Sequence, residues 1–134
     1  MVILIDDDAP VRKALERLIR AAGYDVTSLA DGLAYLALPA PDSPACLVLD
    51  IRMPGMTGFD LQAAVFGTRR ALPIVFITGH GDEDVRAQAL ATGAVDVLFK
   101  PIDETALVRA IERALGKRPP GGTGDRSSER SARG

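Results

Sequence analysis

The sequence lacks several features that would assign it to a specialised class of protein. Cys46 is the single cysteine among 134 residues, so an intrachain disulfide is excluded and the count fits a reducing compartment. No apolar stretch approaches the length of a membrane span. The opening MVILI has no basic segment before it and meets three aspartates after a very short apolar run, which does not fit a secretory signal. We therefore expect a cytoplasmic protein without a membrane partner.

The chain also lacks a strong net charge. Sixteen Lys and Arg residues against eighteen Asp and Glu residues give a net charge of −2, so a nucleic acid is not favoured as a partner. The segment 117–134 holds five of the basic and two of the acidic residues, a net charge of +3, and residues 1–116 hold the other eleven and sixteen, a net charge of −5. Because 117–134 has no aliphatic side chain beyond one alanine, it cannot bury a core. We predict one folded domain, 1–116, and a flexible basic tail or linker, 117–134.

Residues 1–116 alternate between short aliphatic runs and helical patterns. Strands are expected at 2–5, 25–29, 46–49, 74–78 and 95–99. Three of these runs are apolar almost throughout, which is typical of parallel strands covered on both faces. Helices are expected after Pro10, at 32–38, from Thr57, from 82 to Gly93 and after Asp103. Five β–α units predict an α/β fold, namely a doubly wound five-stranded parallel sheet with helices on both faces.

Local signals mark where several of these helices begin. Asp8 lies near the start of the first helix, where a carboxylate is favoured. Thr57 and Asp60 have the spacing of a capping box. In the first helix the apolar residues recur at helical spacing, and the opposite, polar face carries Arg12, Lys13, Glu16 and Arg17.

Polar side chains close all but the second of the predicted strands. They are Asp6 and Asp7 after the first strand, Asp50 after the third, Thr78 after the fourth and Lys100 after the fifth. In an open α/β sheet, ligands bind outside the carboxyl ends of the strands. Segments far apart in sequence thus bring three carboxylates, a hydroxyl and an ammonium to one edge of the sheet.

This set of side chains suits the transfer of a phosphoryl group. Crowded carboxylates are unfavourable unless a cation neutralises them, and an oxygen-only site with room for water suits Mg²⁺. Lys100 offers a positive charge to phosphate oxygens, and Thr78 can donate a hydrogen bond to the same group. Asp50, at the centre, then suits a nucleophile that forms an acyl phosphate.

Four motifs, in this order, carry a resemblance to a known family: LIDDD, LVLDIRMPGMTG, FITGHGD and LFKP. They resemble the motifs of response-regulator receiver domains, the phosphoacceptor half of two-component signalling, over about residues 1–116. The resemblance implies a flavodoxin-like sheet with strand order 2-1-3-4-5. TGHGD and RMPGMTG are most similar to the subgroup in which the receiver precedes a helix-turn-helix DNA-binding domain.

The resemblance implies a metal site built around the phosphorylated residue. Asp50 matches the aspartate that is phosphorylated in the family. Asp6 and Asp7 match its acidic pair, of which Asp7 would bind Mg²⁺ directly and Asp6 mostly through water. The backbone carbonyl of Arg52 would be a further metal ligand.

The resemblance also implies a conformational switch. Thr78 and Lys100 would hold the phosphoryl oxygens, with the Lys100–Pro101 bond cis. Phe99 occupies the position of an aromatic residue that moves inward when Thr78 is drawn toward the phosphoryl group. An aromatic side chain that only packs in the core is the alternative for Phe99.

Two further residues flank the predicted site. His80, the only histidine, is better interpreted as a loop residue bordering the site than as a metal ligand or a phosphohistidine. Arg52 and His80 lie two residues after Asp50 and Thr78. We predict that they border the phosphoryl group, control the access of water and so set the lifetime of the phosphorylated form.

The predicted function is a phosphorylation switch. A sensor histidine kinase would donate the phosphoryl group, and the chain would catalyse only its own phosphorylation and dephosphorylation rather than act on a metabolite. Phosphorylation would change the conformation of the surface formed by the helix ending at Gly93, strand 95–99 and the helix after Asp103. In this family that surface is a dimerisation face. A homodimer and control of transcription are therefore expected. Because 1–134 contains no helix-turn-helix pattern, direct contact with nucleic acid is not assigned to this chain.

Three alternatives differ in class. A haloacid-dehalogenase type of phosphotransferase needs a second aspartate two residues after the nucleophile, where this chain has Arg52. A flavodoxin-like cofactor binder would want small or hydroxyl residues after the first strand, where this chain has DDDAP. A stand-alone phosphorelay or protein-interaction regulator without DNA-binding output stays open.

Overall fold

Five parallel strands form one sheet in the computed structural model, which describes residues 1–79 and 83–116. The strands are β1 (Val2–Ile5), β2 (Val26–Leu29), β3 (Cys46–Asp50), β4 (Ile74–Thr78) and β5 (Asp96–Phe99). Their order is β2-β1-β3-β4-β5, which confirms the order that the family resemblance implied. His80 and the predicted tail 117–134 lie outside the described residues.

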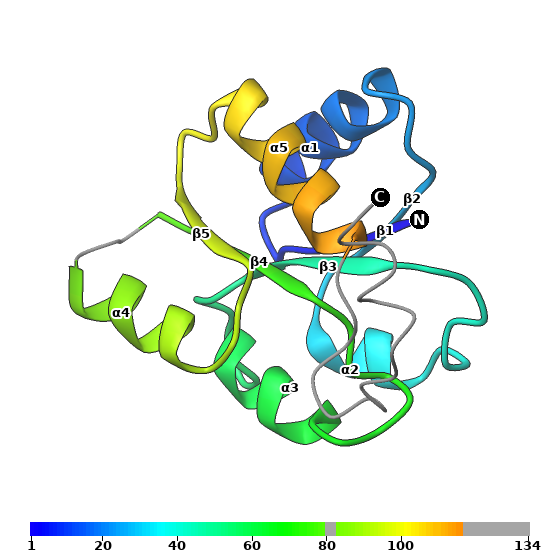
Figure 1. Ribbon diagram of the computed structural model, residues 1–134, viewed down its shortest axis with the longest axis vertical. Coiled ribbons are helices and arrows are strands. Elements are labelled where there is room, and N and C mark those ends of the chain that lie inside the picture. Colours follow the sequence, from blue (N-terminus) through cyan, green and yellow to red (C-terminus); the bar gives the residue numbers. More distant parts are fainter. Residues whose placement is uncertain (80–82, 117–134) are drawn as a thin grey trace, which may run out of the picture.

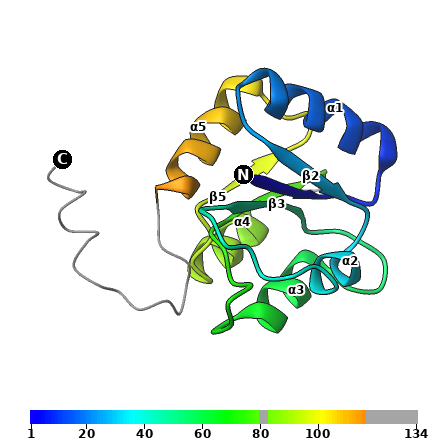
Figure 2. The same cartoon turned by 90° about the vertical axis from the view of Figure 1, so that its right-hand side faces the viewer.

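Helices cover both faces of the sheet (Figure 1). One layer contains α1 (Ala9–Ala21) and α5 (Glu104–Leu115), and the other contains α2 (Gly32–Leu36), α3 (Gly58–Val65) and α4 (Glu83–Ala91). Figure 2 shows the sheet edge-on between these layers. Every residue of β1, β3 and β4 is buried, because each face of these strands packs against one layer of helices.

Each layer has its own apolar core. Leu15 and Ile19 of α1 and Leu107 and Ile111 of α5 pack on one face of the sheet. On the other face, the core includes Tyr35, Leu61, Val65 and Ala89 from the three remaining helices. Cys46 is buried as predicted, and burial raises the pKa of its thiol to about 12, which keeps it in the uncharged form.

The capping residues predicted for the first and third helices are confirmed, whereas two helices are shorter than predicted. The side chain of Asp8 caps α1, and Thr57 and Asp60 form a reciprocal capping box at α3. The second helix was expected to reach 38 but ends at Leu36. Pro39 follows Leu38, and because the residue before a proline disfavours helical dihedral angles, the helix ends before Leu38, with Ala37 as its C-cap. The fourth helix was expected to reach Gly93 but ends at Ala91. No helix in the described part of the chain is long and apolar enough to cross a membrane.

Candidate metal centre

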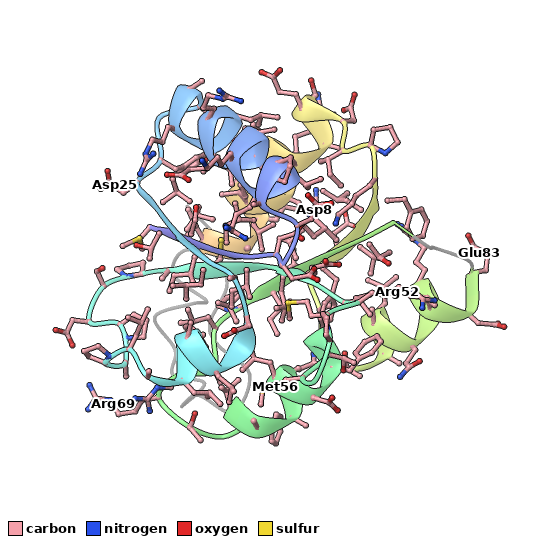
Figure 3. All side chains as sticks on the ribbon, turned by 180° about the vertical axis from the view of Figure 1, so that it is seen from behind. Asp8, Asp25, Arg52, Met56, Arg69 and Glu83 are labelled. Atoms are coloured by element: carbon pink, nitrogen blue, oxygen red, sulfur yellow. The ribbon has the colours of Figure 1, made fainter. Side chains whose placement is uncertain are left out.

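The carboxyl ends of the strands meet at one edge of the sheet. Figure 3 shows Asp8 and Arg52, which follow β1 and β3, at this edge, with Glu83 at the start of α4 on the same side. Asp25, which precedes β2, lies at the opposite edge (Figure 3). The predicted site residues are therefore concentrated where open α/β sheets bind ligands.

Three carboxylates gather at this edge as the sequence predicted. Asp6, Asp7 and Asp50 each offer an oxygen atom, and these atoms all lie within 4.8 Å of one another. Asp6 is fully buried and Asp50 is 3% exposed, whereas Asp7 is exposed. The cluster therefore has a buried side formed by protein and an open side where water and a ligand can enter.

The two oxygens of Asp6 have different surroundings. Oδ1 accepts a hydrogen bond from the backbone N–H of Asp8 at 2.9 Å. Oδ2 lies 3.0 Å from Nζ of Lys100, as an ion pair, but no donor among the described residues makes an aligned hydrogen bond to this buried oxygen. A buried carboxylate oxygen with spare acceptor capacity, beside two further carboxylates, fits a hard divalent cation such as Mg²⁺.

Asp50 lies at the end of β3 in a setting that disfavours its ionisation. Oδ1 accepts a hydrogen bond from the backbone N–H of Arg52 at 3.2 Å, and Oδ2 lies 3.5 Å from Nζ of Lys100. Burial, and then the negative charge of Asp6, raise the pKa of Asp50 to about 7, although Lys100 acts in the opposite direction. The ionised carboxylate that a nucleophile needs is thus favoured by a cation at this site.

Lys100 is held as an ammonium between the two buried carboxylates. Partial burial favours its neutral form, but pairing with Asp6 and the charge of Asp50 outweigh this and raise the pKa of Lys100. The backbone N–H of Lys100 donates to the carbonyl of Thr78 at 2.8 Å, which joins the ends of β5 and β4. The Lys100–Pro101 bond is cis, as the resemblance implied, and Pro101 is exposed.

The structure brings the two predicted switch residues side by side. Thr78 ends β4, is fully buried and pairs in register with Phe99 of β5. Phe99 is half-buried and packs against the core on the side of α4. Arg52 is exposed in the loop after β3. The predicted effect of Arg52 and His80 on the phosphorylated form stays a prediction.

The amphipathic pattern of the first helix did not predict that Arg12 contacts the site. Arg12 was placed on the polar face of the first helix, but it is half-buried and its Nη1 donates to the backbone carbonyl of Asp6 at 2.6 Å. Periodicity assigns charged side chains to solvent and cannot show that a long side chain turns back toward the preceding strand.

The raised pKa of Asp50 predicts a pH-dependent stability. In the unfolded chain this carboxyl has its ordinary pKa of 3.8, whereas in the folded chain its pKa is about 7. Between these values the folded state alone keeps the proton, so the free energy of unfolding falls as the pH rises through this window and levels off above it. We expect a loss of about 4 kcal/mol, measured by urea unfolding in EDTA. In Asp50→Asn this decrease should be absent; an equal decrease in both proteins would contradict the assignment.

The fold and the site together define a class: a doubly wound α/β domain that binds a charged ligand outside its strand ends. The family described as the response regulator receiver domain matches residues 2–112. The chain therefore belongs to this family and is a receiver domain of the two-component response regulators, as its motifs indicated.

Curated relatives support this assignment. Transcriptional regulatory protein FixJ of Bradyrhizobium diazoefficiens is 40% identical over 120 residues, which are 89% of this chain and 58% of FixJ. Response regulator protein TodT of Pseudomonas putida is 37% identical over 119 residues, 89% of this chain and 52% of TodT. The chain thus spans a little over half the length of these relatives.

Solved structures agree with the fold. The response regulator StyR superposes with a TM-score of 0.80 at 39% identity, covering 98% of this chain and 63% of that structure. FixJ-N superposes with a TM-score of 0.78 at 38% identity, covering 87% of this chain and 94% of that structure.

Proposed function

We propose that Asp50 accepts a phosphoryl group from a sensor histidine kinase in a reaction that depends on Mg²⁺. The observation that carries this proposal is the position of Asp50, which is buried at a strand end, within 4.8 Å of two other carboxylates and 3.5 Å from a lysine ammonium. Asp6 also follows a strand and pairs with Lys100, at 3.0 Å, but Asp50 ends β3, the central strand of the sheet, between the acidic pair after β1 and Lys100 after β5.

The residues of the site divide the work of phosphoryl transfer. Asp6, Asp7, Asp50 and the backbone carbonyl of Arg52 would hold Mg²⁺, which supplies charge neutralisation and orients a phosphoryl oxygen. An oxygen of Asp50 forms the bond to phosphorus while the bond from phosphorus to the donor nitrogen breaks. Lys100, already an ammonium, neutralises charge on the transferred group.

Thr78 and Phe99 provide a route from the site to the surface. The hydroxyl of Thr78 donates to a phosphoryl oxygen, and Phe99, its register partner on β5, moves inward in response. The altered face, α4–β5–α5, then serves as the homodimer contact. In this proposal the protein is a cytoplasmic transcription regulator, and residues 117–134 act as a linker to a DNA-binding domain. The alternative is a stand-alone protein-interaction regulator. Nucleic acid is not contacted by the receiver itself.

Labelling with a small phosphodonor tests the proposal. We expect acetyl phosphate and Mg²⁺ to add one phosphoryl group to the chain, measured by intact mass. When EDTA replaces Mg²⁺, the initial rate should fall by about 100-fold, because the charge of three carboxylates would then oppose the approach of an anion. NaCl at equal ionic strength controls for screening. A labelling rate that is the same with Mg²⁺ and with EDTA would rule out the metal-dependent mechanism.

A further inference from the structure

Arg12 binds the backbone at the point where the acidic pair leaves the sheet. Its Nη1 donates to the carbonyl oxygen of Asp6 at 2.6 Å, and this carbonyl belongs to the peptide bond that joins Asp6 to Asp7. The N–H of Asp6 donates to the carbonyl of Leu29 at 3.2 Å. The backbone of Asp6 is therefore held by β2 on one side and by the side chain of Arg12 on the other.

The position of Asp7 depends on these neighbouring contacts. Its exposed side chain makes no hydrogen bond or ion pair with any residue in 1–79 or 83–116. Asp8 follows Asp7 and donates its backbone N–H to Oδ1 of Asp6. The backbone carbonyl of Asp8 accepts a hydrogen bond from the backbone N–H of Arg12 at 2.8 Å. The carboxylate of Asp7 thus reaches the cluster because the turn from Asp6 to Asp8 is fixed at both ends.

We propose that Arg12 is a positioning residue for the metal site. By holding the carbonyl of Asp6, it sets the direction of the Asp6–Asp7 peptide and so the separation of the Asp7 carboxylate from the carboxylates of Asp6 and Asp50. This inference rests on the proposed binding of Mg²⁺. Residues that orient metal ligands without touching the metal typically change metal affinity by about 10–100-fold.

The sign of the effect separates positioning from electrostatics. A guanidinium beside a cluster of carboxylates repels a divalent cation, so a residue acting only through its charge would weaken Mg²⁺ binding, and its removal would strengthen it. A positioning residue has the opposite effect, because its removal lets Asp7 move away from the other ligands. Arg17 is the matched control, since it is an exposed arginine on the same helix without a contact to the site.

The test compares Arg12→Met with Arg17→Met by calorimetric titration with Mg²⁺. We expect the Kd of Arg12→Met to rise at least about tenfold and that of Arg17→Met to stay within about twofold. In acetyl phosphate labelling, the half-saturating Mg²⁺ concentration should rise equally, while the rate at saturating Mg²⁺ stays within about threefold. A general loss of structure would lower the labelling rate at saturating Mg²⁺ as well, so it would not raise the half-saturating Mg²⁺ concentration alone. Urea unfolding checks the fold, and Arg12→Gln replaces Arg12→Met if the latter does not fold.

Two results distinguish failure of this inference from failure of the proposed function. An unchanged or lowered Kd in a folded Arg12 variant, with normal Mg²⁺ binding by the parent, overturns the positioning role alone. A parent chain that binds no Mg²⁺ overturns the proposed metal dependence and the positioning role with it.

Discussion

Asp50→Asn is expected to lose phosphoryl labelling entirely while its free energy of unfolding rises at neutral pH. The amide of asparagine lacks the anionic oxygen that attacks phosphorus, so the labelling rate in acetyl phosphate and Mg²⁺ should fall by at least about 1,000-fold. The same change removes a charge that burial and Asp6 both disfavour. In EDTA at pH 8, we expect a gain of about 4 kcal/mol, measured by urea unfolding.

Asp25→Asn is the control for this experiment. Asp25 is exposed and lies at the opposite edge of the sheet (Figure 3). Its replacement removes one carboxylate but should leave labelling at the parent rate and the free energy of unfolding within about 0.5 kcal/mol. Labelling of Asp50→Asn as strongly as Asp25→Asn would place the acceptor on another residue.

Gly58→Ala is expected to be the most destabilising small substitution near the site. Gly58 begins α3 directly behind the phosphoacceptor strand and donates its N–H to the carbonyl of Ile51 at 2.9 Å. A Cβ atom on Gly58 would lie 2.7 Å from the carbonyl oxygen of Asp50, 3.0 Å from Cα of Ile51 and 3.2 Å from the ring of Phe76. Because two of these are buried backbone atoms at the end of β3 and directly after it, they can move away only at a large cost in free energy. We expect the free energy of unfolding to fall by about 2–3 kcal/mol in urea.

The clash should also slow phosphorylation, because it displaces the backbone of Asp50, the phosphoacceptor. We expect slower labelling of Gly58→Ala at saturating Mg²⁺ under conditions where the variant is folded, by about tenfold or more. Gly79→Ala is the matched control, since among the described residues other than its chain neighbours the nearest atom to its Cβ would be Cδ of Lys100 at 3.9 Å. Its free energy of unfolding should change by less than about 1 kcal/mol. If both alanine variants were equally stable, α3 would not pack against β3 as closely as described.

The parts of the fold that sequence predicts well are those set by local chemistry. Asp8 and Thr57 cap helices because a short polar side chain can bond the free N–H groups of the next turn, and this requirement is visible in a few neighbouring residues. The site was predictable for a related reason. Parallel strands must end at one edge, so Asp50 and Lys100 were expected to meet although 50 residues separate them.

The features that escaped prediction depend on distances between segments. The contact of Gly58 with the end of β3 follows from how closely α3 packs, which no sequence spacing records. Arg12 bonds Asp6 because α1 begins immediately after the turn and its polar face partly overlies that turn. The pKa of Asp50 likewise follows from the depth of burial and the approach of Asp6, and neither is encoded in a motif.

Chemical mapping of the phosphorylated residue tests directly whether one buried carboxylate carries the phosphoryl group. Borohydride reduces an aspartyl phosphate to homoserine, and peptide mass spectrometry then locates the altered residue. After treatment with acetyl phosphate and Mg²⁺, we expect homoserine at position 50, and none when EDTA replaces the metal. Homoserine at position 6 or 7 instead, or a labelled chain that yields no homoserine, would contradict the assignment of Asp50 as the phosphoacceptor.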